Sequence, residues 1–429
     1  MKKKILFPCV ILLSLCSCGE TIKGSWHSIV ATQDDIITTI NTTVPPFNTV
    51  MNLNYFLYDD QEDKNDQILN QVTSIYNSEV SRLHKIFDRH YYYKAQDDYS
   101  VDVITNIKTI NDSYGTNQEV KCSDELYSLL KTSIHGYELT NGYFNIFTGS
   151  LTDYWNQIFD EVLNFGGSLQ DNDPYYNESK KQQLEEIVSS IPNTIEEVKQ
   201  QLTFNDENKT VTFNKLEKNV IRPYISVGGI AKGMATDIIK NKFIESGYLN
   251  GYLISGGSSI STVSKPIYTN KEKGQNLSVI NPATSNIVEK KAAFSLKFTE
   301  EFNFSTSGNY TTGKSYSFKT DNGDIVYRHH IINPFTGYPE SYYRSVSIAT
   351  SYFSNAMVDI FSTALMNTSI EEGIVLRNKL FEMYPNGDFN VFYLRQIGDD
   401  DNAEVTVYAT SDMNKTLKTE KGVNVVYEK

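Results

Sequence analysis

Apolar side chains recur along this chain at intervals that predict helices in several segments. In residues 66–88 they repeat every three to four positions, as they do on a helix with one buried face. Residues 123–140 also have a helical pattern, and Ser123 with the two acidic residues behind it suits a helix start. Residues 354–367 are helix-like as well. We therefore expect at least three helices.

Other segments have the composition of strands. Residues 48–60 predict a first strand, and residues 202–213 predict a hairpin with two β-rich arms around residues 205–208. Residues 252–257 indicate a strand that ends in a glycine turn, and the chain from Phe389 indicates two strands and a tail. Strands and helices are interspersed without a regular βαβ rhythm, so the pattern favours an α+β fold over a doubly wound sheet.

The first residues of the chain have the features of an export signal. Three lysines precede an apolar run over residues 5–15, which is short for a membrane span. Leu15 and the small residue before Cys18 resemble the bacterial lipobox, in which the chain is cut before a cysteine that then carries lipid. An ordinary secretory signal that contains cysteines is the alternative. We expect an exported lipoprotein, held on the extracytoplasmic face of the membrane by lipid on Cys18.

The length and net charge of the chain limit its domain organisation and its possible partners. With 429 residues, 39% of them hydrophobic, the chain can bury a large core as one domain or as two closely packed ones. The polar residues 18–46 indicate a tether between a signal peptide at residues 1–17 and a folded domain at residues 47–429. The net charge of −13 becomes −16 without the three lysines of the signal, which argues against a nucleic-acid partner.

The helix-like segment carries candidate metal ligands. Asp359 and Thr363 are four residues apart, so a helix places them on one face. A carboxylate and a hydroxyl there could bind one Mg²⁺, which prefers oxygen ligands and often shares its shell with a substrate phosphate. Taken alone, such a pair is more often a solvated helix face.

A glycine-rich segment is the second candidate. Residues 226–233 join an expected strand to an expected helix at residues 234–246, and they include Lys232. Glycines let a ligand approach the backbone, and the amides of a helix start favour a phosphate, to which Lys232 adds positive charge. A plain turn with a solvated lysine explains this segment equally well on its own.

Seven segments, in order along the chain, together resemble the FAD:protein FMN transferases of the ApbE family. They are residues 140–155, 191–202, 226–237, 253–257, 305–310, 329–340 and 356–365. The resemblance covers roughly residues 47–395, and collinear order over this length is far more specific than any single motif. It implies an ApbE-like, T-fold-related α+β fold with mixed sheets, packed helices and two intimately associated subdomains.

The resemblance also implies a Mg²⁺-dependent reaction with FAD as the substrate. FAD is cleaved between its phosphates, AMP leaves, and FMN passes to a Thr or Ser hydroxyl of an acceptor flavoprotein. Such phosphoryl transfer depends on positioning and charge neutralisation. Two alternatives stay open. The first is an FAD pyrophosphatase that uses water and gives FMN and AMP, and the second is a lipoprotein that binds a flavin or another solute without chemistry.

Individual site residues follow from the matched motifs. The implied metal ligands are Gly229, Asp359, Ser362 and Thr363, with backbone oxygens acting for Gly229 and Ser362. The implied flavin contacts are Met51, His90, Tyr143, Phe144, Asn145, Ser226, Lys232 and Ile332. His330 is the candidate base for the acceptor hydroxyl, because a free imidazole titrates near neutrality. The alternative role for His330 is to hold its loop.

The chain departs from the family pattern at several positions. Asn145, Ser226 and Asn333 stand where the family usually has Asp, and Ser258 replaces the Asp that commonly follows two glycines. Asparagine keeps the shape and hydrogen bonding of Asp but loses its charge. We therefore expect retuned contacts on the phosphate or ribose side of the nucleotide. Asn111 is placed either near the flavin or, more simply, in a turn.

Overall fold

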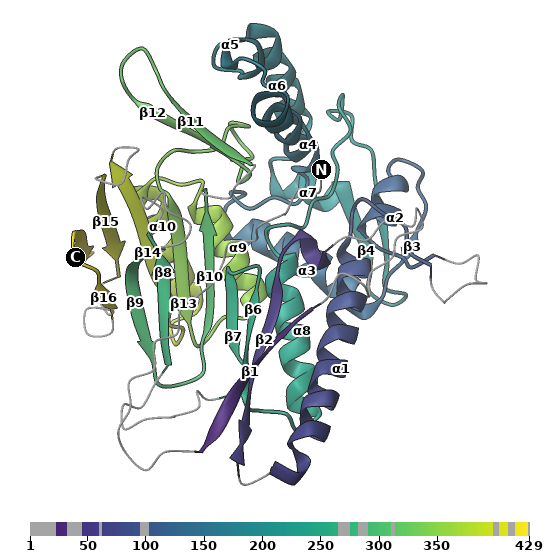
Figure 1. The fold of residues 1–429 in the computed structure, drawn as a ribbon. Helices are drawn as coiled ribbons and strands as arrows, with labels where there is room; N and C mark the ends of the chain where they lie inside the picture. The colour runs from purple at the N-terminus through teal and green to yellow at the C-terminus, as the bar shows by residue number, and fades with distance from the viewer. Residues whose placement is uncertain are drawn as a thin grey trace.

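One large sheet organises the molecule. The computed structural model describes residues 23–31, 45–59, 62–94, 103–264, 275–281, 291–309, 314–397, 403–410 and 417–427. The sheet has nine strands, in the order β1-β2-β6-β7-β10-β13-β14-β15-β17, and only β15 and β17 pair in parallel (Figure 1). These strands are β1 (Gly24–Val30), β2 (Met51–Tyr58), β6 (Gly251–Ser255), β7 (Ser259–Thr262), β10 (Asn303–Gly308), β13 (Ser345–Thr350), β14 (Asn390–Ile397), β15 (Glu404–Ala409) and β17 (Val423–Tyr427).

Helices cover one face of this sheet. α1 (Glu62–Phe87) packs on β2, α8 (Ala231–Glu245) on β6 and β7, and α9 (Asn355–Leu365) on β10 and β13. α3 (Asp124–Leu139) lies against α9 from outside. The other helices are α2 (Ile107–Asp112), α4 (Gly149–Phe159), α5 (Leu169–Asn172), α6 (Glu178–Ser190), α7 (Ile195–Gln201) and α10 (Ile370–Met383), with a 3-10 turn at Pro46–Asn48 and a π-helical turn at Asp160–Asn164.

A smaller sheet covers part of the opposite face. It has the order β16-β9-β8, from β8 (Gln275–Ile280), β9 (Ala292–Phe298) and β16 (Leu417–Thr419). Successive side chains of β14 point to opposite faces of the large sheet. Val391 and Tyr393 therefore enter the core on the helix side, while Phe392 and Leu394 enter the core between the two sheets. Two further sheets are β3 (Val120–Lys121) with β5 (Thr210–Phe213) and β4 (Leu202–Asn205), and the hairpin of β11 (Ser315–Lys319) and β12 (Ile325–His329).

Several sequence predictions are confirmed. The expected helices correspond to α1, α3 and α9, and the Ser123 hydroxyl caps α3 by accepting a hydrogen bond from the Leu126 N–H. The expected first strand is β2, and the expected hairpin is β4 with β5. The α+β class is confirmed as well, because in the part of the chain that the structure describes no helix joins two parallel neighbouring strands.

Three predictions are wrong. Residues 24–30, expected within a tether, form edge strand β1 and pair with β2. The residues before Ser226 form no strand, because Asn111 binds the backbone of Ile225 where a neighbouring strand would. The expected C-terminal tail contains β16 and β17, which pair with distant strands.

Some predictions lie outside the described residues. The signal peptide and Cys18 belong to this group. Within the part of the chain that the structure describes, no helix is both long enough and apolar enough to cross a bilayer.

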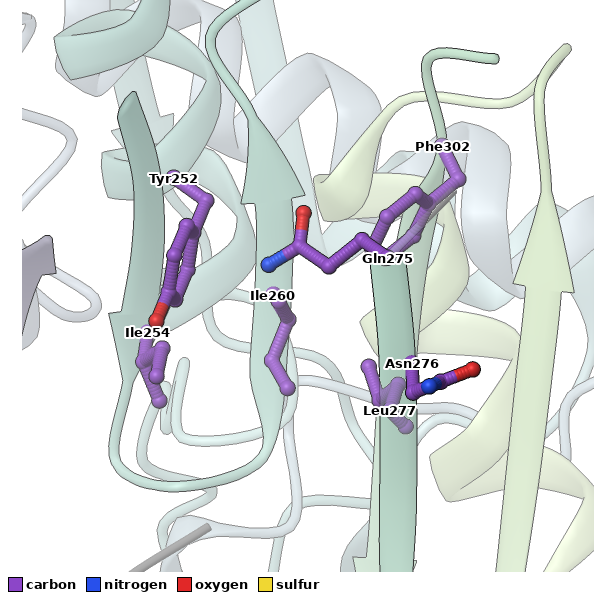
Figure 2. Close-up of a pocket in the computed structure, with 7 residues that line it drawn as sticks. All are labelled: Tyr252, Ile254, Ile260, Gln275, Asn276, Leu277 and Phe302. Atoms are coloured by element: carbon purple, nitrogen blue, oxygen red, sulfur yellow. The ribbon is translucent and has the colours of Figure 1, made fainter. Parts of the chain in front are cut away.

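A shallow pocket opens between the two packed sheets (Figure 2). Figure 2 shows its lining side chains on β6, β7 and β8 and beside them, namely Tyr252, Ile254, Ile260, Gln275, Asn276, Leu277 and Phe302. Ile260 belongs to the core between the sheets, whereas its neighbour Ser259 bonds Asp359 on the helix side. The pocket therefore lies across the sheet from the predicted site.

Candidate active site

A buried carboxylate is the centre of the candidate site. Asp359 on α9 is 4% exposed. Its Oδ1 accepts hydrogen bonds from the hydroxyls of Ser259 at 2.5 Å and Ser305 at 2.6 Å. Its Oδ2 accepts one from the Gly233 N–H at 2.7 Å. A carboxylate offers about four lone-pair positions, so one more ligand can still be accommodated.

The charge of Asp359 is incompletely balanced by the protein. Burial raises the pKa of this carboxyl, while the positive charge of Lys232 and the hydrogen bonds from Ser259 and Ser305 oppose the rise. Among the described residues, no cation lies within ion-pair distance of Asp359. A divalent cation at this position would favour the ionised carboxylate.

Close packing of α8 on α9 sets the position of Asp359. A Cβ at Gly233 would lie 2.3 Å from the Asn355 carbonyl oxygen, so only glycine allows the two helices to come this close. Asp237 of α8 then accepts the N–H groups of Asn355 at 2.9 Å and Ala356 at 2.8 Å. A carboxylate at the positive end of α9 stabilises the helix start that carries the site.

The glycine-rich loop faces the other predicted metal ligand. A Cβ at Gly229 would lie 3.0 Å from Thr363 Oγ1 and 3.2 Å from a ring carbon of Phe144. Lys232 Nζ donates to the Gly228 carbonyl at 3.2 Å. Its side-chain carbon Cδ packs against the backbone of Gly256, where an added Cβ would lie only 2.9 Å away. The loop backbone, the Thr363 hydroxyl and a lysine therefore meet beside Asp359.

The predicted metal ligands fit Mg²⁺ unequally. Asp359, Thr363 and the Gly229 backbone are neighbouring oxygen donors, which suits a hard ion that keeps several waters. Ser362 fits less well, because its carbonyl already accepts the Met366 N–H at 3.2 Å and its hydroxyl lies 2.8 Å from Ser307. No group of three or more His, Cys, Asp or Glu side chains able to hold a metal occurs among the described residues. The predicted ligand set itself contains one carboxylate, that of Asp359.

Tyr143 and Phe144 reach the site from the loop after α3. Phe144 packs beside Gly229, and Tyr143 meets the exposed ring of Phe335 edge to face, with 5.3 Å between ring centroids. Asn145 turns inward, donating to the Pro192 carbonyl at 2.9 Å and accepting the Phe147 N–H at 2.9 Å. Its polar atoms shape the loop, so the predicted nucleotide contact through Asn145 is not supported by this geometry.

Four other predicted flavin contacts either expose little side-chain surface or lie at the edge of the site. Met51 is 1% exposed and belongs to the helix-side core, and Ile332 is also buried. His90 is exposed and its N–H donates to Asp88 Oδ1 at 2.5 Å. Ser226 is half-buried, and its N–H donates to the Ile146 carbonyl. Contacts at Met51 and Ile332 would use mainly backbone atoms.

The two histidines before Ile331 have different surroundings. His329 is buried, and its Nε2 lies 2.8 Å from the Glu340 carbonyl while its Nδ1 accepts the Ile331 N–H. His330 is exposed. Desolvation by the surrounding protein lowers the pKa of His330, and the charges of Lys232 and Lys314 lower it further, although solvent contact limits the shift. The His330 imidazole is therefore neutral at pH 7, as a base requires.

Sequence reasoning missed several residues that organise the site. The strand residues Ser259 and Ser305 bind Asp359, and Asn367, just after α9, contacts the loops of Tyr143 and Ile332. Ser305 lies in a matched segment, but nothing local indicates that its hydroxyl faces a carboxylate.

The fold is that of solved ApbE proteins. The ApbE protein of Thermotoga maritima is 20% identical, with a TM-score of 0.55 over 86% of this chain and 94% of that one. The flavin transferase ApbE of Vibrio cholerae is 16% identical, with a TM-score of 0.53 over 92% and 99%. The flavinyl transferase ApbE of Pseudomonas stutzeri, in its apo form, is 13% identical, with a TM-score of 0.57 over 92% and 97%.

The sequence gives the family directly. The model of the ApbE family matches residues 57–384, so this chain belongs to the ApbE family. The comparison with curated proteins gave no match. The resemblance and the fold expected from it are thus confirmed, whereas the roles of single residues remain predictions.

Asn333 lies beside a carboxylate, next to which an uncharged amide is favourable. Its Nδ2 donates to Glu340 Oε1 at 2.8 Å, and burial already raises the pKa of Glu340. We predict that Asn333→Asp lowers the free energy of unfolding by about 1–3 kcal/mol at pH 8, because two carboxylates would meet. The folded pair has a raised pKa, so the penalty is full above that pKa and fades as pH falls through it.

Urea unfolding at pH 8 and pH 5 measures this effect. The variant should approach the wild type in stability at pH 5. A penalty that is equal at both pH values would show that the Asn333–Glu340 contact is not its cause.

Proposed function

We propose that this chain transfers FMN from FAD to a Thr or Ser hydroxyl of an acceptor flavoprotein, with release of AMP and a requirement for Mg²⁺. The family and the flavin-transferase names of the similar structures support this activity. The observation that carries it is the buried carboxylate of Asp359, which forms no ion pair with any described residue and lies near Thr363, the Gly229 loop and Lys232.

The protein groups supply positioning and charge. The acceptor oxygen attacks the phosphorus of the FMN half, the bond from that phosphorus to the bridging oxygen breaks, and AMP leaves with the bridging oxygen. Asp359 and Thr363 would hold Mg²⁺, which would supply positive charge against the pyrophosphate. Lys232 adds positive charge beside the same loop. His330 takes the proton of the acceptor hydroxyl.

Hydrolysis with the same site is the competing function, because water can replace the acceptor hydroxyl. The test incubates the chain with FAD with and without Mg²⁺, and with and without an acceptor, while AMP and in-gel flavin fluorescence are recorded. Transfer predicts AMP release that depends on acceptor and Mg²⁺, together with a fluorescent acceptor band. Equal AMP release without acceptor would favour the pyrophosphatase.

The pH dependence of transfer tests His330. Because the pKa of its imidazole is lowered, the base stays neutral as pH falls through 6.5, and the acidic limb of kcat should lie below that value. Lys314→Met removes one charge that lowers this pKa, so the limb should move to higher pH. A limb that does not move in Lys314→Met, or that persists in His330→Gln, would assign it to another group.

We also propose that the mature chain is exported and tethered to the membrane by lipid on Cys18. The lysines, the apolar run and the lipobox-like residues support this location. Cys18→Ser should release the protein from washed membranes into the soluble fraction of an extracytoplasmic extract. Continued membrane association of this variant would exclude lipid on Cys18 as the anchor.

A further inference from the structure

A single buried amide lies where three parts of the site meet. Asn367 is 2% exposed and follows the end of α9. Its Nδ2 lies 3.4 Å from the carbonyl oxygen of Tyr143, 3.3 Å from that of Ile332 and 3.4 Å from that of Thr363. These carbonyls belong to the loop after α3, the segment after β12 and α9 itself.

The three hydrogen bonds of the Asn367 Nδ2 group are individually weak. An amide nitrogen has two hydrogens for three carbonyls, so at least one hydrogen bond is bifurcated, and all three are long. The Asn367 Oδ1 has no hydrogen-bond partner among the described residues, which costs free energy at a buried position. Stability alone therefore gives a poor account of this side chain.

The backbone of Asn367 also contacts the loop that contains Asn333. Asn333 Nδ2 lies 3.4 Å from the Asn367 carbonyl and 2.8 Å from Glu340 Oε1. The segment that follows β12 is thereby held to α9 twice, once through each asparagine. A shift of Asn367 would move both predicted flavin segments relative to the helix that carries the metal ligands.

We propose that Asn367 is the positioning residue that fixes the two flavin-contacting segments, at Tyr143 and Ile332, on the helix of Asp359 and Thr363. This inference rests on the proposed function, because it requires that these segments bind a flavin. Asn367 acts through backbone atoms of its neighbours and is buried from the ligand. Its removal should weaken FAD binding even when no transfer takes place.

The test measures the dissociation constant for FAD by quenching of flavin fluorescence, without Mg²⁺ and without acceptor. Asn367→Ala should weaken FAD binding at least tenfold. Asn367→Asp keeps the size of the side chain but loses both N–H donors, so it should weaken binding as much. An Asp variant with wild-type affinity would show that volume, and not the donated hydrogen bonds, matters here.

Asn219→Ala is the matched control. Asn219 is 3% exposed, donates to the Ser190 carbonyl at 2.7 Å and accepts the Leu216 N–H at 2.7 Å, away from the flavin segments. This variant should lose thermal stability with FAD affinity unchanged within twofold. Equal weakening of FAD binding in Asn219→Ala and Asn367→Ala would mean general loosening of the fold and would overturn the inference.

The outcomes separate this inference from the proposed function. Wild-type protein that binds no FAD would overturn both. Wild-type protein that binds FAD, with both Asn367 variants within twofold of its affinity, would overturn the positioning role alone. Melting temperatures of all variants, measured in parallel, show that each compared sample is folded.

Discussion

Replacing Asp359 by asparagine should lower kcat for flavin transfer by about a hundredfold or more, because Asp359 is the one charged side chain among the predicted metal ligands. The fold should tolerate the change. Asparagine has nearly the same shape, and the hydroxyls of Ser259 and Ser305 can rotate to donate or accept. The melting temperature without metal should therefore stay within a few degrees of the wild-type value.

Metal linkage gives this prediction a second readout. Millimolar Mg²⁺ should raise the melting temperature of the wild type, since a ligand that binds only the native state stabilises it. The rise should disappear in Asp359→Asn. Asp388→Asn is the matched control, because Asp388 is also a hydrogen-bonded carboxylate, bound to Thr350 and Ser351, and it is not part of the site. An active Asp359→Asn enzyme that Mg²⁺ still stabilises would refute the metal assignment.

Removing Asp173 should destabilise the fold strongly, at a position outside the site. Arg328 Nε lies 2.9 Å and Nη2 3.1 Å from its two carboxylate oxygens, and the two residues are 4% and 0% exposed. The guanidinium also lies 5.1–5.4 Å from the ring centroids of Trp155, Phe318 and Tyr338. Asp173→Ala leaves this cation buried and unpaired, so the free energy of unfolding should fall by about 3–5 kcal/mol.

Urea unfolding of Asp173→Ala and of two comparison variants measures this effect. Lys181→Ala, which breaks a surface pair with Glu178, should cost under about 1 kcal/mol. Asp173→Ala with Arg328→Met should recover much of the loss, because no unpaired charge remains. A double variant as unstable as Asp173→Ala would show that packing of the β11–β12 hairpin, rather than the unpaired charge, dominates.

Local sequence patterns were sufficient for elements that local chemistry determines. α3 begins where Ser123 caps it, and the β4–β5 hairpin follows from β-rich arms around a polar turn. The Asp359–Thr363 pair was predictable because helical spacing alone sets it. Membership of the α+β class followed from the order of these elements.

Features that depend on distant pairing were beyond the sequence. β1 looked like a tether because its polar, Thr-rich surroundings hide a strand that pairs with β2. Ser259 and Ser305 are ordinary strand residues until the sheet brings their hydroxyls to Asp359. Gly233 and Asn367 likewise gain their roles from packing between elements that lie far apart in the chain.

The most direct test of the proposed activity is the intact mass of a purified acceptor protein after reaction with this chain, FAD and Mg²⁺. FMN transfer predicts that the acceptor gains the mass of one FMN less one water, with one AMP released for each acceptor modified. An acceptor of unchanged mass, accompanied by equal amounts of free FMN and AMP, would contradict it.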